Sequence, residues 1–210
     1  MNKHQGVFIT LEGIEGAGKS THADYIRRLL ANDYTDVVLT REPGGTELGE
    51  RIRDVLLMHQ ELHIEPEAEL LLMFTARLQH LKQVIIPGLA SGKIVICDRF
   101  TDSSYAYQGG GRGISRDMID KLVNIVHPDL KPDLTILLDL SAETGLARAR
   151  QSGIADRFES ETLKFFENSR QTFLDIARAE PDRVFVINAE QDIGNTQQEI
   201  KQVLEGKGLC

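Results

Sequence analysis

The chain has 210 residues, of which 41% are hydrophobic and 27% are charged, and its formal net charge is −8. This length suits one domain with a single buried core, and the negative charge argues against broad binding to nucleic acid or to anionic membranes. No apolar run is long enough for a membrane span, the first residues are polar rather than typical of a signal peptide, and the two cysteines lack the spacing of a disulfide framework or a metal site. We therefore expect a reduced, cytoplasmic protein that binds neither nucleic acid nor membranes.

Five short segments rich in Val, Ile, Leu and Phe are predicted to form buried strands, and apolar residues recur at helical spacing between them. The predicted strands are Val7–Leu11, Val37–Leu39, Ile94–Cys97, Leu134–Leu140 and Val184–Ile187. The predicted helices run from Ser20 to about Ala31, from near Glu47, from Pro66 to about Pro87–Gly88, and over Asp117–Val126, Ala142–Gln151, Glu161–Ala179 and Ile193–Leu204.

The alternation of strands and helices predicts an α/β fold, in which a five-stranded parallel sheet carries helices on both faces. Ligands bind at the carboxyl ends of the strands in such a sheet. Three predicted strands are followed there by segments that contain polar or charged residues, namely Glu12–Thr21, Arg41–Gly45 and Asp98–Arg99. Since no repeat or linker divides the chain, we expect residues 1–210 to form one domain with a basic lid segment at about 148–159.

Residues 13–20, Gly-Ile-Glu-Gly-Ala-Gly-Lys-Ser, match the phosphate-loop pattern G-x-x-x-x-G-K-S between a predicted strand and a predicted helix. Glycines let successive backbone N–H groups curl around phosphate oxygens, and the helix N-terminus adds partial positive charge. Lys19 can reach the β- and γ-phosphates of ATP, and the Ser20 hydroxyl can ligate Mg²⁺. The alternative, a glycine-rich turn without a ligand, is disfavoured by this context. The expected nucleotide contacts are Gly13, Ile14, Glu15, Gly16, Ala17, Gly18, Lys19, Ser20 and Thr21.

Switch GTPases, motor ATPases and small kinases all use phosphate loops, and other segments distinguish them. A switch GTPase would carry Asn-Lys-x-Asp after a strand, but residues 188–192 read Asn-Ala-Glu-Gln-Asp. A motor ATPase usually places an acidic pair after a strand, where this chain has Asp98-Arg99. An arginine beside the reaction centre favours an anionic second substrate over an attacking water, and therefore phosphoryl transfer between nucleotides.

Three further motifs, at residues 41–46 (Arg-Glu-Pro-Gly-Gly-Thr), 98–100 (Asp-Arg-Phe) and 107–113 (Tyr-Gln-Gly-Gly-Gly-Arg-Gly), are similar to those of the thymidylate kinase family. With the phosphate loop and residues 146–159, the chain resembles the bacterial branch of this family from about Val7 to Phe173. The resemblance implies a P-loop nucleoside monophosphate kinase fold and transfer of the γ-phosphoryl of ATP to dTMP, giving dTDP and ADP with Mg²⁺. It also implies a homodimer. The apolar helix from Pro66 to Ile86 is a candidate interface, although it could equally be core.

By this resemblance, Arg99 and Arg53 would hold the dTMP phosphate, and Glu15 would lie near that phosphate and the sugar 3′-hydroxyl. Asp98 would orient the neighbouring arginine or a magnesium-bound water, so that Ser20 and Asp98 form the expected metal site. The alternative for Asp98 and Arg99 is a structural ion pair at the end of a strand.

At the other end of dTMP, Arg77 would read the carbonyl edge of thymine, while Tyr107 and Gln108 would crowd the sugar 2′ position and contact the base. The alternatives are core packing for Tyr107 and a bond to backbone for Gln108. Many family members carry an aromatic residue four positions before the arginine, where this chain has Met73 followed by Phe74. Neighbouring helical residues differ by roughly 100° in direction, so both cannot face the base equally. The full set of expected substrate contacts is Glu15, Arg53, Met73, Phe74, Arg77, Arg99, Ser104, Tyr107 and Gln108.

Arg148, Arg150 and Arg157 cluster in the predicted lid of an otherwise acidic chain. The bacterial branch lacks an arginine in the phosphate loop and is expected to use lid arginines instead. Because Arg148 and Arg150 are two residues apart, they do not share a helix face, so that one could pair structurally while the other reaches nucleotide. We place Arg150 first and Arg157 second at the transferred phosphoryl, and Arg148 at the bound nucleotide. Lys19 and Arg99 complete the expected catalytic set.

Two other functions remain as alternatives. One is a kinase that acts on a different monophosphate or on a deoxynucleoside, and the other is a nucleotide-binding module without turnover. Acceptor-dependent ATP consumption distinguishes the second from a kinase. His59, His80 and His127 are isolated in the sequence, and we expect ordinary packing or solvent exposure for all three.

Overall fold

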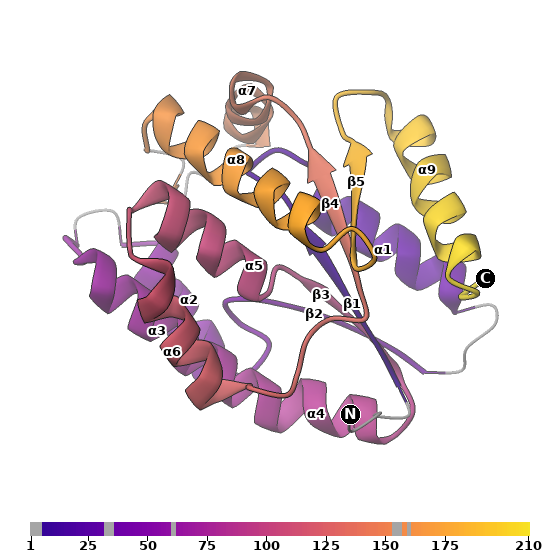
Figure 1. Cartoon of the computed structure of the whole chain (residues 1–210), viewed down its shortest axis with the longest axis horizontal. Helices are drawn as coiled ribbons and strands as arrows, with labels where there is room; N and C mark the ends of the chain where they lie inside the picture. Colours follow the sequence, from indigo (N-terminus) through magenta and orange to yellow (C-terminus); the bar gives the residue numbers. More distant parts are fainter. Residues whose placement is uncertain (1–5, 32–35, 60–61, 153–156, 159–160) are drawn as a thin grey trace.

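The computed structural model describes residues 6–31, 36–59, 62–152, 157–158 and 161–210 (Figure 1). At its centre is a sheet of five parallel strands in the order β2-β3-β1-β4-β5. The strands are β1 (Val7–Glu12), β2 (Val37–Arg41), β3 (Ile94–Asp98), β4 (Leu134–Asp139) and β5 (Val184–Asn188). They match the predicted segments closely, so the predicted five-stranded parallel sheet is confirmed.

Helices cover both faces of the sheet, as predicted. Figure 1 shows α1 and α9 on one face and α3, α4, α5 and α8 on the other. The helices are α1 (Lys19–Leu30), α2 (Glu47–Leu57), α3 (Pro66–His80), α4 (Ile86–Ala90), α5 (Thr101–Ser104), α6 (Arg116–Val126), α7 (Ala142–Ser152), α8 (Leu163–Ala179) and α9 (Ile193–Gly206), with π-helical segments η1 (Leu81–Ile85) and η2 (Tyr105–Gly111). In the part of the chain that the structure describes, no helix combines the length and the apolar character needed to cross a membrane.

The three middle strands are buried on both faces, which explains their continuous apolar runs. Two threonines are exceptions, Thr10 on β1 and Thr135 on β4. Their hydroxyl oxygens lie 2.7 Å apart, within hydrogen-bond distance, so neither hydroxyl is buried without a partner. The strand order reverses at β1, and the loop after β1 therefore emerges between the carboxyl ends of β3 and β4, where ligands bind in folds of this kind.

The long helix that starts at Pro66 continues beyond its predicted end. Helical structure persists through η1 and α4 to Ala90, so the prediction that Pro87 and Gly88 end it is wrong. Pro87 lies in the first turn of α4, and the missing N–H of a proline is tolerated in a first turn. The helical path ends at Ser91, and Gly92 follows with a φ of 76°.

A helical segment that the sequence analysis did not predict, α5 with η2, follows β3. Its serines and glycines are weak helix formers, so propensity gives little warning of it. The segment packs against α8, and burial of Ala106 and Tyr107 supplies the stability that propensity lacks. The wide turns of η2 carry Tyr107 and Gln108, and π-helical turns are frequent at functional sites.

Candidate functional site

A cavity of about 470 Å³ lies at the carboxyl ends of β1, β2 and β3. Most of the residues expected at the substrates line it together, although they come from several distant segments of the chain. These lining residues are Glu15, Gly16, Gly18, Lys19, Ser20, Thr21, Arg53, Met73, Arg77, Asp98, Arg99, Ser104, Tyr107, Gln108 and Arg148. The expected residues that do not line it are Gly13, Ile14, Ala17, Phe74, Arg150 and Arg157.

The loop between β1 and α1 has the backbone geometry that its sequence pattern requires. Gly18 directly precedes α1 with a φ of 81°, a conformation that glycine adopts without a steric cost. Gly16 also has a positive φ, and a Cβ at this position would lie 2.2 Å from the carbonyl oxygen of Gly145 at α7. The backbone of the phosphate loop therefore touches the backbone of α7 directly.

Lys19 is buried at the start of α1, and its Nζ donates to the carbonyl oxygen of Ile14, 2.9 Å away. Burial, together with the positive charge of Arg99, lowers the pKa of Lys19 to about 8. Anionic phosphates beside the lysine would oppose both effects, because an opposite charge favours the protonated amine. Of the inner loop residues, Gly13 contributes a carbonyl oxygen that accepts from Arg99, and Ala17 packs in the core.

Two oxygen-bearing side chains meet at the end of β3. The Ser20 hydroxyl donates to Asp98 Oδ2 across 2.8 Å, which joins the first turn of α1 to the last residue of the strand. A hydroxyl and a carboxylate next to a phosphate loop are ligands of the kind that Mg²⁺ takes. The donor set of the predicted metal site therefore fits magnesium chemically.

Arg99 extends from the end of β3 toward the phosphate loop with a φ of 71°, a conformation that is uncommon for residues other than glycine. Its Nη2 donates to Glu15 Oε1 across 2.8 Å, and its Nη1 donates to the Gly13 carbonyl oxygen across 3.0 Å. The Tyr107 hydroxyl donates to the second oxygen of Glu15 across 2.7 Å, and the Arg99 guanidinium lies 4.8 Å from the centre of the Tyr107 ring. Glu15 thus holds Arg99 and Tyr107 in place. Burial raises the pKa of Tyr107 well above its ordinary value, so its hydroxyl keeps the proton that it donates.

Arg77 reaches the cavity from α3 and is almost fully buried. Its Nε donates to Glu42 Oε2 across 2.6 Å, while Nη1 donates to the Ser104 hydroxyl and Nη2 to the carbonyl oxygen of Phe100. Arg53 approaches from α2 and donates to the carbonyl oxygen of Pro43 across 3.0 Å. Together with Lys19 and Arg99, these arginines make the cavity suited to anionic ligands.

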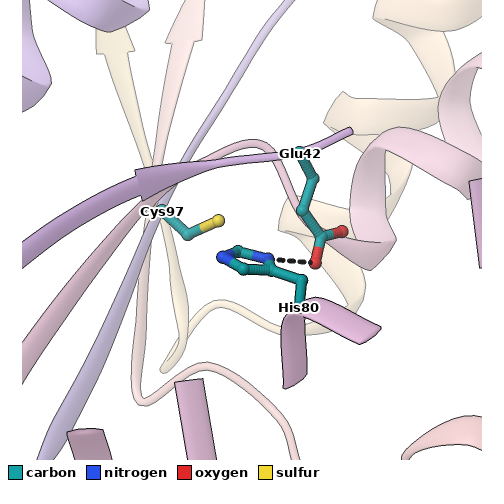
Figure 2. Close-up of side chains that lie close together, drawn as sticks. All are labelled: Glu42, His80 and Cys97. Carbon is teal, nitrogen blue, oxygen red and sulfur yellow. Dashed lines mark hydrogen bonds and ion pairs between the residues drawn. The ribbon is translucent and has the colours of Figure 1, made fainter. Parts of the chain in front are cut away.

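Glu42, His80 and Cys97 form a buried cluster behind Arg77 (Figure 2). Their candidate ligand atoms lie within 4.8 Å of one another, but these atoms already have partners. His80 Nδ1 donates to Glu42 Oε1 across 3.0 Å, and its Nε2 lies 2.6 Å from the Thr40 hydroxyl. Since Arg77 occupies the other Glu42 oxygen, the cluster is better explained as a hydrogen-bonded support for Arg77 than as a metal site.

His59, His80 and His127 do not line the cavity. His80 and His127 are buried, and His127 Nε2 lies 2.9 Å from the Thr101 hydroxyl. His59 Nε2 lies 3.4 Å from Asp54 Oδ2, and both side chains are partly exposed. Burial lowers the pKa of His127 to about 4, so this side chain is neutral near pH 7.

The structure shows which of the neighbouring residues Met73 and Phe74 on α3 faces the cavity, a question that the sequence left open. Met73 lines the cavity. Phe74 is buried in a cluster with Leu70 and Ile119, and its ring is stacked on that of His127. The apolar contact that α3 offers to a ligand therefore comes from Met73.

The three arginines predicted in the lid have different surroundings. Arg148 lines the cavity, and its guanidinium donates to the carbonyl oxygens of Ala189 and Glu190. Arg150 is exposed on α7. Arg157 donates to the carbonyl oxygen of Leu56 across 2.9 Å and pairs with the buried Glu69. The remainder of the predicted lid, residues 153–156 and 159, lies outside the described residues.

Several residues in the lining were not among the predicted contacts: Arg41, Glu42, Pro43, Leu57, Phe100, Ser103, Ala149 and Phe158. The motif that follows the second predicted strand contains Arg41, Glu42 and Pro43. Because ligands bind at the carboxyl ends of the strands in such a sheet, the sequence already indicated this segment. Phe158 has no comparable signal, because a single aromatic residue in a charged segment is typical of many surfaces. Glu69, which accepts from Gln108, was also missed, because an acid in the first turn of a helix is common on the surface.

Known proteins resemble this chain over nearly its whole length. The family model described as thymidylate kinase matches residues 11–200. Among curated relatives, the thymidylate kinase of Pseudomonas fluorescens is 56% identical over 199 residues, which cover 95% of each chain, and that of Pseudomonas putida is 52% identical over 201 residues, which cover 96% of each. A crystal structure of thymidylate kinase from Ehrlichia chaffeensis superposes with a TM-score of 0.79 at 37% identity and covers 95% of this chain and 98% of that one. This chain belongs to the thymidylate kinase family.

Proposed function

We propose that this protein transfers the γ-phosphoryl group of ATP to dTMP, giving dTDP and ADP. The observation that carries the proposal is the pairing of two anion-binding groups in one cavity. The phosphate loop with Lys19 lines this cavity together with the arginines that follow β3 and extend from α2 and α3. A hydrolase needs only the first group, whereas a kinase with a nucleotide acceptor needs both.

On the donor side, the backbone from Gly13 to Thr21 and the amine of Lys19 bind the phosphates of ATP. Ser20 and Asp98 are the residues that would hold magnesium, and a bound magnesium ion would neutralise charge on the β- and γ-phosphate oxygens. Arg148 contributes a further positive charge at the edge of the cavity, toward the bound nucleotide.

On the acceptor side, Arg99 and Arg53 bind the dTMP phosphate, and Arg77, Met73, Ser104, Tyr107 and Gln108 surround the nucleoside. A phosphate oxygen is already ionised near neutral pH, so attack on the γ-phosphorus requires no general base. The protein contributes alignment and charge neutralisation, which are the main requirements of phosphoryl transfer.

Residues 1–210 act as one domain, and the segment at 148–159 acts as a lid that excludes water from the closed site. Arg150 then reaches the transferred phosphoryl from the exposed face of α7. Arg157 is the second candidate for this role, although in the present arrangement its guanidinium pairs with Glu69.

The protein acts as a cytoplasmic homodimer. Exposed apolar side chains recur at i and i+7 on two helices that pack together, Leu48 and Val55 on α2 and Leu71 and Leu78 on α3. This spacing places each pair on one helix face. Exposed apolar side chains on two adjacent helices support a second copy of the chain as partner.

The test is ADP production with Mg-ATP and each nucleoside monophosphate in turn. We expect a large signal with dTMP and a weaker one with dUMP, and we expect Lys19→Ala to lower kcat by at least about a hundredfold while circular dichroism stays unchanged. Activity with CMP or AMP instead of dTMP would assign a different acceptor. Near-normal turnover by Lys19→Ala would remove the phosphate loop from the reaction.

A further inference from the structure

Glu69, in the first turn of α3, is a fully buried carboxylate next to the cavity but outside it. Its Oε1 accepts from Gln108 Nε2 across 2.9 Å. Its Oε2 accepts from Arg112 Nη2 across 3.1 Å and also pairs with Arg157. Both carboxyl oxygens of Glu69 thus face hydrogen-bond donors and act as acceptors.

This contact determines which way the side-chain amide of Gln108 points. A glutamine amide carries donors on nitrogen and an acceptor on oxygen, and only the nitrogen can face a carboxylate. Since Gln108 also lines the cavity, the carbonyl oxygen is the end of the amide that is left for a bound base. The cavity therefore presents a hydrogen-bond acceptor at this place.

We propose that Glu69 is a specificity-determining positioning residue, which selects thymine over cytosine by holding the Gln108 carbonyl oxygen toward the base. Thymine carries an N–H at ring position 3, which can donate to this oxygen, whereas cytosine carries a lone pair there. A cytosine base would leave two acceptors facing each other away from water, a mismatch that sites of this kind reject strongly. This inference rests on the proposed function, in which Gln108 contacts the base.

The surroundings of Glu69 explain why the orientation is held firmly. Arg112 also pairs with Glu161 across 2.5 Å, and the guanidinium groups of Arg112 and Arg157 lie 5.5 and 5.1 Å from the centre of the Phe158 ring. Phe158 lines the cavity and meets the Tyr107 ring edge-on. Rotation of Glu69 away from Gln108 would disturb these contacts as well, so the carboxylate has one favoured position.

The test compares Glu69→Gln with Glu161→Gln. Both substitutions remove a carboxylate that pairs with Arg112, but only the first changes the partner of Gln108. A glutamine at position 69 can donate as well as accept, so Gln108 becomes free to turn over. We expect the ratio of kcat/KM for dTMP to that for dCMP to fall at least about tenfold in Glu69→Gln and to stay within about twofold of wild type in Glu161→Gln.

Binding provides a second measurement that does not depend on turnover. In the wild-type protein, dTMP should raise the melting temperature more than dCMP does. This difference between the two ligands should be smaller in Glu69→Gln. If Glu69→Gln does not fold, the combination of Glu69→Gln with Arg157→Met removes one of the two cations that pair with Glu69, while Arg112 keeps its pair with Glu161. A slowing that affects dTMP and dCMP equally leaves the ratio of their kcat/KM values unchanged.

A folded Glu69 variant with the wild-type ratio would overturn the inference, as would an equal loss of selectivity in Glu161→Gln. Failure of the proposed function gives a different result, because the wild-type protein itself would then not phosphorylate dTMP.

Discussion

Arg99 and Glu15 form an ion pair in the lining of the cavity, with Arg99 Nη2 and Glu15 Oε1 2.8 Å apart and both side chains largely buried. The pair joins the end of β3 to the middle of the phosphate loop. An acid beside a triphosphate is electrostatically unfavourable, and the partnership with Arg99 offsets this cost. In the proposed function, where Arg99 binds the acceptor phosphate, this pair orients the arginine in advance, so that less ordering remains when the acceptor binds.

Removal of the Tyr107 hydroxyl tests the importance of this arrangement. Tyr107→Phe keeps the ring beside Arg99 but deletes the bond to Glu15. We expect a several-fold rise in the KM for dTMP, little change in kcat, and a loss of about 1–2 kcal/mol in the free energy of unfolding. Tyr105→Phe is the matched control, because Tyr105 donates to Asp120 outside the cavity. An equal rise in KM for both variants would mean that the effect does not arise from Glu15.

The depressed pKa of Lys19, about 8 because of burial and the nearby Arg99, predicts a pH dependence of activity. The free enzyme loses this charge above pH 8, so kcat/KM for ATP should fall there, whereas kcat should fall only at higher pH because bound phosphates favour the protonated amine. Lys19→Arg, whose side chain keeps its charge, should abolish the fall in kcat/KM even if its rate is low. Parallel profiles of the two parameters in the wild-type protein would contradict this assignment.

The same pKa affects stability. Between about pH 8 and the ordinary lysine value of 10.5, the unfolded chain binds the proton that the folded protein has lost. The contribution of Lys19 to stability therefore increases as the pH rises through this window.

The raised pKa of Glu12 predicts that the free energy of unfolding depends on pH below about pH 7. Its carboxylate accepts from the Phe100 N–H and the Ser103 hydroxyl, and burial, with a contribution from Asp102, raises its pKa to about 7. The folded protein therefore binds more protons than the unfolded chain between about pH 4.5 and 7, and this group makes stability fall as the pH rises through that window.

We expect Glu12→Gln to reduce the decrease in the free energy of unfolding between pH 5 and pH 8 by about 1–3 kcal/mol, measured by urea unfolding at both pH values. The replacement keeps the size of the side chain and one acceptor. A variant whose stability follows the same pH dependence as the wild type would show that Glu12 titrates at its ordinary value.

The exposure of Arg150 permits a clean test of its proposed role. Arg150→Ala should leave the melting temperature almost unchanged and lower kcat at least about tenfold, with less effect on the KM for dTMP. Arg148→Ala is the comparison, and because Arg148 bonds two backbone carbonyl groups, we expect it to lower stability as well. A change in Arg150→Ala confined to the KM for dTMP would instead place this arginine at the acceptor.

We expect the largest change in stability from substitution of Glu42. It is buried between Arg77 and His80, and Glu42→Gln leaves the charge of Arg77 without a counterion. We expect a loss of about 3–5 kcal/mol in the free energy of unfolding, together with a higher KM for dTMP. Glu50→Gln, which breaks an exposed pair with Arg41, should cost about 1 kcal/mol or less. Similar losses in the two variants would show that Glu42 contributes no more than a surface charge.

The sequence predicted those parts of the site that follow directly from strand ends. Continuous apolar runs identify β1, β3 and β4, and a parallel sheet brings the residues after them to one edge, so Lys19, Asp98 and Arg99 were expected to lie together. The orientation of side chains on helices was harder to predict. Met73 and Phe74 are both apolar, and only the packing of α6 and His127 against α3 determines which of them faces inward.

Burial of charge was the other feature that the sequence did not reveal. Glu69 has the position of an ordinary first-turn acid, and its burial depends on η2 and on Arg157, which are distant in sequence. The helical path of α5 and η2 was unexpected for a related reason, since tertiary contacts with α8 stabilise a segment of poor helix formers.

The contact between the phosphate loop and α7 limits how the chain can vary. A Cβ on Gly145 would lie 2.6 Å from the carbonyl oxygen of Glu15, just as a Cβ on Gly16 would overlap Gly145. Even the smallest side chain at either position would force the helix that carries Arg148 and Arg150 away from the phosphate loop. These two glycines should therefore be nearly immutable in a random library selected for growth, and no substitution at one of them could compensate for a substitution at the other.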